Sequence, residues 1–127
     1  MSNVGTRFFM LAALAVVVGM IWGLQMAATQ DHSLKSAHAH LNLVGWVTMA
    51  IFGFYYRITP AASGTKLAQI HFWVALVGLV LMVPGIAIAT SGGSEGMAIA
   101  GSFLSFGSML IFGYTVLRHG LGQAQPA

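Results

Sequence analysis

The 127-residue chain has no cysteine and very little charge. Without cysteine it can form no disulfide, iron–sulfur cluster or thiolate zinc site. Only 6% of its residues are charged and 57% are hydrophobic, whereas soluble domains carry about 25% charged residues. A small soluble chain leaves much of its surface exposed and could not hide so much apolar area. The composition therefore predicts a protein whose solvent is the lipid bilayer.

Four apolar stretches are long enough to cross a membrane, because about 20 helical residues span the hydrocarbon core. They cover residues 8–28, 37–56, 67–90 and 97–117. Short polar loops join them, which suits antiparallel neighbours. We therefore expect an all-α protein in which residues 1–127 form a single four-helix transmembrane bundle.

Small residues recur at helical spacing along the fourth stretch, and they let helix backbones approach closely in lipid. We expect them to pack within the bundle. These residues are Ala98, Gly101, Ser102, Ser105 and Ser108.

The first stretch also has the outline of a secretory signal peptide, since a basic residue precedes an apolar run that ends in small residues. The run continues through Trp22, however, and is long enough to span a bilayer. We therefore favour a membrane span over a cleaved signal.

The basic residues predict how the chain is oriented. Arg7, Arg57, Lys66 and Arg118 fall on one side of the expected bundle, whereas Lys35 stands alone on the other. Lys and Arg accumulate in cytoplasmic loops. We therefore expect a multi-pass protein of the cell inner membrane with cytoplasmic N- and C-termini. Because the basic residues are spread over the loops, the net charge of +3 does not indicate a nucleic-acid partner.

The candidates for chemistry are histidines, since ionisable groups in membrane segments are costly and usually functional. His32 and His119 fall in a loop and in the C-terminal tail, where solvation explains them. His71 opens the third stretch, and we expect it to be packed or hydrogen-bonded inside the protein. His38 and His40 open the second stretch as a His-Ala-His pair.

The two histidines of this pair point about 200° apart on an α-helix. They cannot coordinate one small ion together, but each can bind a different group, one on each flank of the helix. Two planar cofactors or two neighbouring subunits would fit this arrangement, and imidazole is a common axial ligand of heme iron. Spacing alone leaves a second interpretation open, in which His38 and His40 bind lipid headgroups or backbone carbonyls.

The sequence around the pair resembles a known family. Residues 31–60 read DHSLKSAHAHLNLVGWVTMAIFGFYYRITP, with an aspartate, an Ala-His-x-His pair six residues later, an aromatic end and a proline. This pattern resembles the tenth helix of subunit I of the heme–copper oxidases. Residues 68–85, AQIHFWVALVGLVLMVPG, resemble the eleventh helix. By extension, the chain resembles the last third of that subunit, helices nine to twelve.

The resemblance implies a cofactor and its ligands. In the family, the first histidine of the pair binds the high-spin, oxygen-reacting heme and the second binds the low-spin heme. Carried over, His38 takes the first position and His40 the second, as ligands of a heme that we take to be of b type. The twelve helices of the subunit form three arcs with approximate threefold symmetry, so one four-helix arc implies a homotrimer.

The chain also departs from the family. Copper in the family is held by three histidines, beside a redox tyrosine, and this sequence has neither a His-His pair nor a clear His-Pro-x-x-Tyr segment. The family's arginine pair is missing from residues 91–96. We therefore expect no copper, no oxygen reduction and no proton pumping.

The expected function is thus that of a small heme-binding membrane protein, for electron transfer or for redox or gas sensing, with unidentified donor and acceptor. The sequence leaves two alternatives open. One is a non-heme accessory or assembly protein of a respiratory oxidase. The other is an enzyme, a minimal heme reductase with an open iron site, although the missing copper ligands disfavour enzymatic activity.

Overall fold

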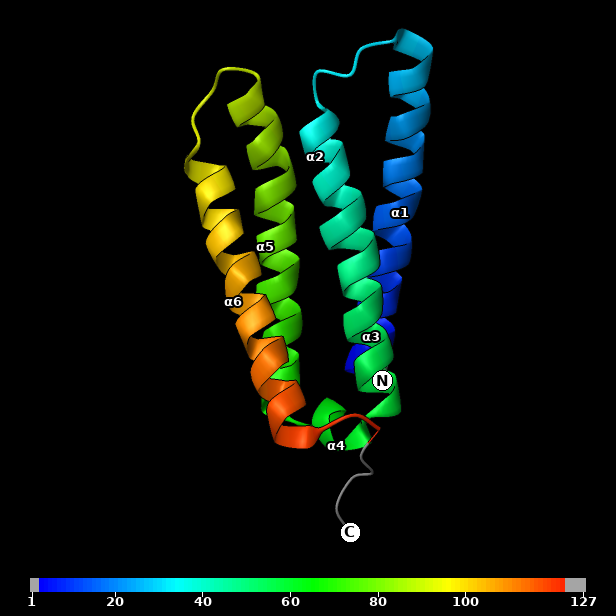
Figure 1. Ribbon diagram of the computed structural model, residues 1–127, viewed down its shortest axis with the longest axis vertical. Helices are drawn as coiled ribbons and strands as arrows, with labels where there is room; N and C mark the ends of the chain where they lie inside the picture. Colours follow the sequence, from blue (N-terminus) through cyan, green and yellow to red (C-terminus); the bar gives the residue numbers. More distant parts are fainter. Residues whose placement is uncertain (1–2, 123–127) are drawn as a thin grey trace.

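The computed structural model describes residues 3–122, and these are folded into helices and short loops (Figure 1). The helical elements in chain order are α1 (Val4–Thr29), α2 (Lys35–His40), η1 (Leu41–Thr48), α3 (Met49–Ile58), α4 (Pro60–Ser63), α5 (Lys66–Thr90) and α6 (Gly96–His119). Elements α2, η1 and α3 follow one another without a break. We call this continuous stretch, residues 35–58, the central rod.

Three helices, α1, α5 and α6, are long and apolar enough to cross a membrane. The protein is therefore an all-helical membrane protein, as its composition predicted. The central rod contains the π-helical segment η1, so none of its separate elements has that length. Each of the four expected stretches lies within one of these helices or within the rod, and whether the rod itself spans the membrane stays a prediction.

Polar side chains set where two of the long helices begin. The side chain of Asn3 accepts a hydrogen bond from the backbone N–H of Thr6 at 2.9 Å, and Thr65 accepts one from Ala68 at 3.2 Å. Each satisfies a backbone donor that has no partner within the helix. At its other end, α1 is closed by Gln30, which has a left-handed φ of 56°.

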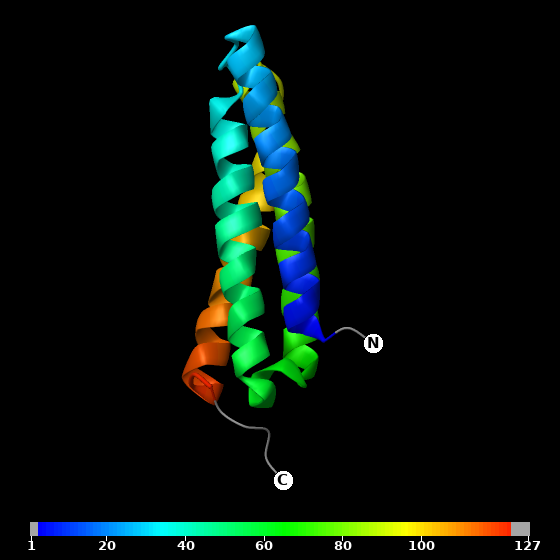
Figure 2. The ribbon, with the colours of Figure 1, turned by 90° about the vertical axis from the view of Figure 1, so that its right-hand side faces the viewer.

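The helices stand side by side, with α1 and α5 running in one direction and the central rod and α6 in the other (Figures 1 and 2). Helix α6 packs on α5 at very short range. A Cβ atom added to Gly101 would lie 2.6 Å from Met82 Cα, and one added to Gly85 would lie 2.7 Å from Ala98 Cα. The expectation that small residues of the fourth stretch pack within the bundle is confirmed for Ala98, Gly101 and the buried Ser108, whereas Ser102 is exposed.

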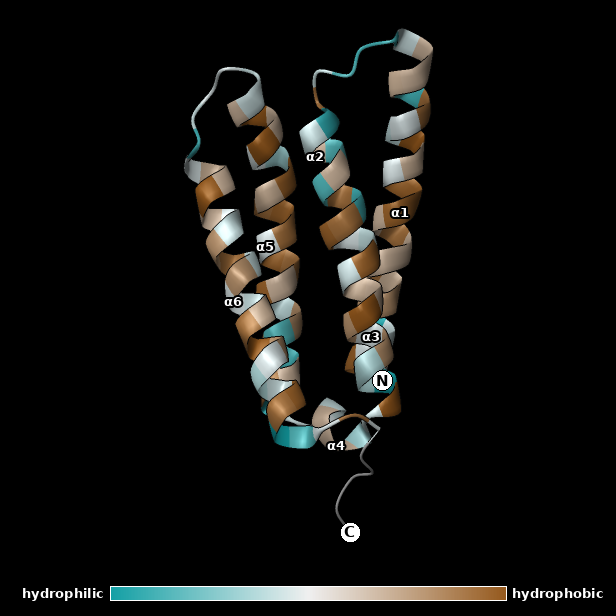
Figure 3. Ribbon diagram, viewed as in Figure 1, coloured by the Kyte–Doolittle hydropathy of each residue, from teal (hydrophilic) through white to brown (hydrophobic). Residues whose placement is uncertain are grey.

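Large apolar side chains face outward along most of the bundle, and Figure 3 shows hydrophobic residues along all the long helices. Leu24, Phe103 and Leu117 are 71%, 72% and 89% exposed. Water-soluble monomers rarely expose extensive apolar surface, so this surface fits lipid. The α1–α2 loop is hydrophilic, and further hydrophilic residues lie near the ends of the helices.

The two ends of the bundle differ in chemistry. We call the end with the α1–α2 loop and α2 the histidine end. Asn3 and Gly122, the first and last described residues, lie at the opposite end, which we call the basic end because Arg7, Arg57 and Lys66 are there.

Candidate functional site

His38 and His40 lie in α2 at the histidine end, and both are half-buried. Ala37 and Leu41 are buried and direct one face of this helix toward the bundle. At 100° per residue, the two histidines then lie on opposite flanks of that face. The structure therefore gives the pair two separate surroundings.

His38 faces α1. Its Nε2 atom lies 2.9 Å from the carbonyl oxygen of Gly19, and its ring meets Trp22 edge-on, with centroids 5.7 Å apart. Asn42 Nδ2 lies 3.2 Å from the same nitrogen, so the contact with Gly19 is the shorter of the two. Because a carbonyl oxygen can only accept, we assign the proton to Nε2, which donates to Gly19. Asn42 supports this placement, because its Nδ2 donates to the His38 carbonyl at 2.9 Å. His38 thus links α2 to α1 in the described conformation.

His40 is bonded differently. Its Nδ1 atom lies 2.7 Å from the carbonyl oxygen of Ser36, one turn earlier on the same helix. Nδ1 must therefore be the protonated nitrogen, and Nε2 keeps a free lone pair. Metal-bound histidines usually donate their other ring N–H to a carbonyl or carboxylate in this way. The bond fixes the tautomer of His40 in which Nε2 can bind a metal.

Few other ionisable groups surround the pair. His32 is exposed, with Nδ1 3.3 Å from the carbonyl oxygen of Gln30. Hydrogen bonds from the Ser33 side chain and backbone hold the pKa of Asp31 below its usual value, so this carboxylate is ionised at neutral pH. Among residues 3–122, no three His, Cys, Asp or Glu side chains come together as a metal-ion site. A metal bound at the pair would thus depend on the histidines and on groups from outside the chain.

The π-helical segment η1 begins directly after His40. Thr48 Oγ1 donates to the carbonyl oxygen of Leu43 at 2.9 Å, five residues back. Single π-helical turns occur frequently at functional sites, so the position of η1 is consistent with a functional role for the adjacent histidine pair. Sequence reasoning missed this segment, because no residue type in it signals an i→i+5 hydrogen-bond pattern.

His71 belongs to a different environment near the basic end. It is 0% exposed, its Nδ1 lies 2.8 Å from the Tyr56 hydroxyl and its Nε2 lies 3.1 Å from Ser108 Oγ. Aromatic rings enclose it, namely Phe8, Phe52, Tyr56 and Phe112. The expectation of a packed, hydrogen-bonded histidine is confirmed. Its two partners could not be identified from the sequence, because they come from different helices.

Taken together, these features define a helical membrane protein with a pair of histidines on opposite flanks of one helix end. Part of the chain is similar to subunit 1 of cytochrome c oxidases, so the predicted resemblance to subunit I of the heme–copper oxidases is confirmed for that part.

Three curated relatives carry this similarity. Cytochrome c oxidase subunit 1 of Rhodobacter capsulatus is 40% identical over 50 residues, which is 35% of this chain and 9% of the relative. The Cbb3-type cytochrome c oxidase subunit CcoN1 of Stutzerimonas stutzeri is 35% identical over 52 residues, 36% of this chain and 11% of the relative. The cytochrome c oxidase subunit 1 homolog, bacteroid, of Bradyrhizobium diazoefficiens is 34% identical over 58 residues, 41% of this chain and 11% of the relative.

The matched part thus spans about a tenth of the length of these relatives. No family model matches the chain. No solved structure is significantly similar to it.

Proposed function

We propose that this protein binds heme in the inner membrane, with His38 and His40 as axial ligands, and that it transfers electrons or senses a redox state or a gas. The partial similarity to cytochrome c oxidase subunit 1 supports a heme site. The observation that carries the proposal is the hydrogen bond from His40 Nδ1 to the Ser36 carbonyl oxygen. It leaves Nε2 free to bind iron, and a bound heme b would supply one-electron chemistry there.

The two histidines fit a heme iron to different degrees. His40 is already in the tautomer that a ligand needs. His38 donates Nε2–H to the Gly19 carbonyl oxygen, so this nitrogen can bind iron only after the bond breaks and the proton leaves Nε2. Under our proposal, heme binding therefore breaks the hydrogen bond between His38 of α2 and Gly19 of α1.

We further propose a homotrimer in which each heme lies between two protomers. The two side chains lie on opposite flanks of α2, so they cannot bind the same iron within one chain. The third histidine of this end, His32, lies in the loop and is exposed. A bis-histidine site would therefore take His38 from one chain and His40 from the next. Such a head-to-tail contact can close a ring of three.

A spectrum, a heme count and a particle mass test this proposal on the purified protein. We expect the visible bands of a bis-histidine b-type heme, one heme per chain, a trimer mass, no stoichiometric copper and negligible oxygen consumption with a strong electron donor. One heme per two chains in a dimer would contradict the shared site, and sustained oxygen reduction would contradict the absence of that activity.

A non-heme accessory role in a respiratory oxidase is the second candidate. The observation that favours it is the internal hydrogen bond of His38 to Gly19, which gives this histidine a structural task without any metal. Protein that purifies without heme and gains no heme band after incubation with hemin would support this candidate and overturn the first.

We also propose that the central rod is a fourth span and that the termini face the cytoplasm. The rod runs from the histidine end to the basic end (Figure 1), and four of the five basic residues lie at or near the basic end. Lys and Arg accumulate on the cytoplasmic side of membrane proteins. A topology reporter fused after Ala127 should report the cytoplasm, and one inserted beside Ser33 should report the opposite side. A reversed result for both fusions would contradict this orientation.

A further inference from the structure

A seam between the parallel helices α1 and α5 combines a fixed positive charge with an apolar groove. At the basic end of this seam, the guanidinium carbon of Arg7 lies 4.2 Å from the ring centroid of Phe72 and 5.3 Å from that of Trp73. Arg7 also donates a hydrogen bond to Gln69 Oε1. These contacts hold the charged group at one position on the seam.

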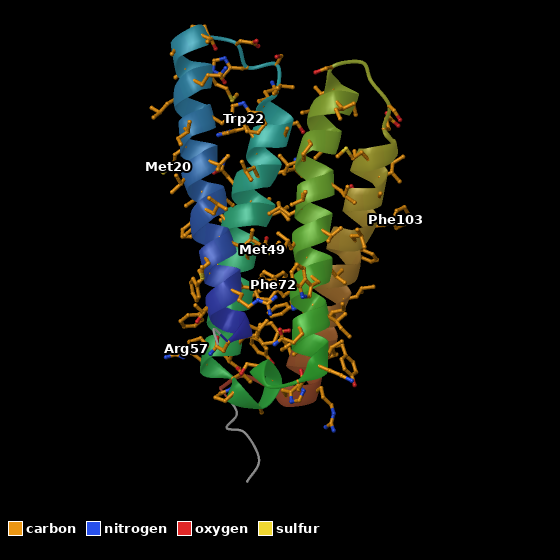
Figure 4. The ribbon with its side chains drawn as sticks, turned by 180° about the vertical axis from the view of Figure 1, so that it is seen from behind. Met20, Trp22, Met49, Arg57, Phe72 and Phe103 are labelled. Carbon is orange, nitrogen blue, oxygen red and sulfur yellow. The ribbon has the colours of Figure 1, made fainter. Side chains whose placement is uncertain are left out.

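The groove lies on the same seam, farther toward the histidine end. It has a volume of about 310 Å³ and a lining that is almost wholly apolar. Helix α1 contributes Leu11, Leu14, Val18 and Trp22 to it, and α5 contributes Val80 and Val83. Figure 4 shows α1 and α5 from this side, with Phe72 between them and Trp22 near the far end.

Helical spacing places the charge and the groove in line. The residues Arg7, Leu11, Leu14, Val18 and Trp22 follow one another by three or four positions, so they share one face of α1. The groove therefore begins one turn beyond Arg7. It extends from Leu11 to Trp22, eleven steps along α1, which corresponds to about 16 Å along the helix.

We propose that this seam binds one anionic phospholipid, with the phosphate on Arg7 and an acyl chain in the groove. Arginine keeps further N–H donors in a planar fork that matches a phosphate group, and only one bond of Arg7 goes to Gln69. Lys66, exposed in the first turn of α5, adds a second cation three residues before Gln69.

The choice of an anionic lipid follows from charge. Basic sites between transmembrane helices bind anionic headgroups, and the seam offers two cations whereas Asp31 and Glu95, the only acidic residues of the chain, lie in loops at the other end. A zwitterionic lipid carries its own cation beside its phosphate, so its headgroup is attracted less strongly to the two cations of the seam. The proposal does not depend on heme binding.

Native mass spectrometry of the detergent-solubilised protein tests the headgroup site. We expect dioleoyl-phosphatidylglycerol to bind more tightly than dioleoyl-phosphatidylcholine, and Arg7→Gln to weaken phosphatidylglycerol binding about tenfold, since charge-assisted hydrogen bonds to phosphate are lost. Arg57→Gln is the matched control, because Arg57 is an exposed cation of the same end that lies away from the seam (Figure 4). Equal affinity for the two lipids, or an equal effect of both variants, would overturn the proposal.

A second pair of variants tests the groove and does not require replacing Arg7. Val18→Trp fills the groove, whereas Val17→Trp adds the same side chain at the neighbouring exposed position. We expect only Val18→Trp to weaken phosphatidylglycerol binding. Unchanged binding by Val18→Trp would refute the acyl-chain position. Dimers that replace lipid adducts and are lost in Val18→Trp would show that a second chain occupies the seam instead.

Discussion

Replacing His40 by alanine is expected to remove heme from the purified protein almost completely. His40 is the histidine whose tautomer already suits a metal, because Nδ1 donates to the Ser36 carbonyl oxygen. In a shared site, every heme needs one His40, so the variant would lose a ligand at every iron. The measurement is the visible spectrum of the protein together with its heme content per chain.

The matched variants are His38→Ala and His32→Ala. We expect His38→Ala to abolish bis-histidine ligation as well, because each shared heme also needs one His38. His32 is an exposed histidine of the same end, and its replacement should leave the spectrum unchanged. An unchanged spectrum in His38→Ala or His40→Ala would mean that this histidine is no ligand. For His38, its bond to Gly19 would then be its whole role.

Replacing Gly101 by valine is expected to destabilise the protein strongly, because α6 packs on α5 at this position. A Cβ at this position would lie 2.6 Å from Met82 Cα in α5, so the two backbones would have to separate. Overpacking of this kind costs about 1–3 kcal/mol and sometimes more. Thermal unfolding of the detergent-solubilised protein would measure it.

Gly107→Val is the control on the same helix. A Cβ there meets no atom within 4 Å, and valine is a better helix former than glycine. This variant should be as stable as the wild type or slightly more stable. If both variants lost stability equally, the close approach of α6 to α5 at Gly101 would not be the cause.

The sequence was sufficient to predict the helical class, because apolar length alone identifies helices that cross lipid. The expected stretches fall within the helices, and their ends differ from the helix ends by at most four residues. Helix α1 begins at Val4, whereas the apolar stretch begins only at residue 8, after the polar Arg7. The Asn3 side chain caps the helix at this earlier start by accepting a hydrogen bond from the Thr6 N–H. The π-helical turns of η1 were missed for a similar reason, because their hydrogen-bond pattern depends on the backbone and not on residue type.

The sequence predicted which two residues form the candidate site, but it did not predict that their surroundings differ. Helical spacing placed His38 and His40 on opposite flanks of one helix. The difference between them depends on their acceptors. His38 bonds Gly19, nineteen residues away on α1, whereas His40 bonds Ser36 on its own helix. The first contact requires knowledge of how α1 and α2 pack, and a single sequence does not contain it.

The buried histidine near the basic end has a consequence for how the bundle assembles. His71 on α5 makes one hydrogen bond within its own hairpin, with Ser108 on α6, and one with the other hairpin, with Tyr56 on α3. A hairpin of α5 and α6 that entered the membrane alone would leave one ring nitrogen without a partner in hydrocarbon, which is costly. Docking of the two hairpins removes that cost only when they meet in the correct register. His71 therefore favours correctly paired hairpins during biogenesis, before any cofactor is bound.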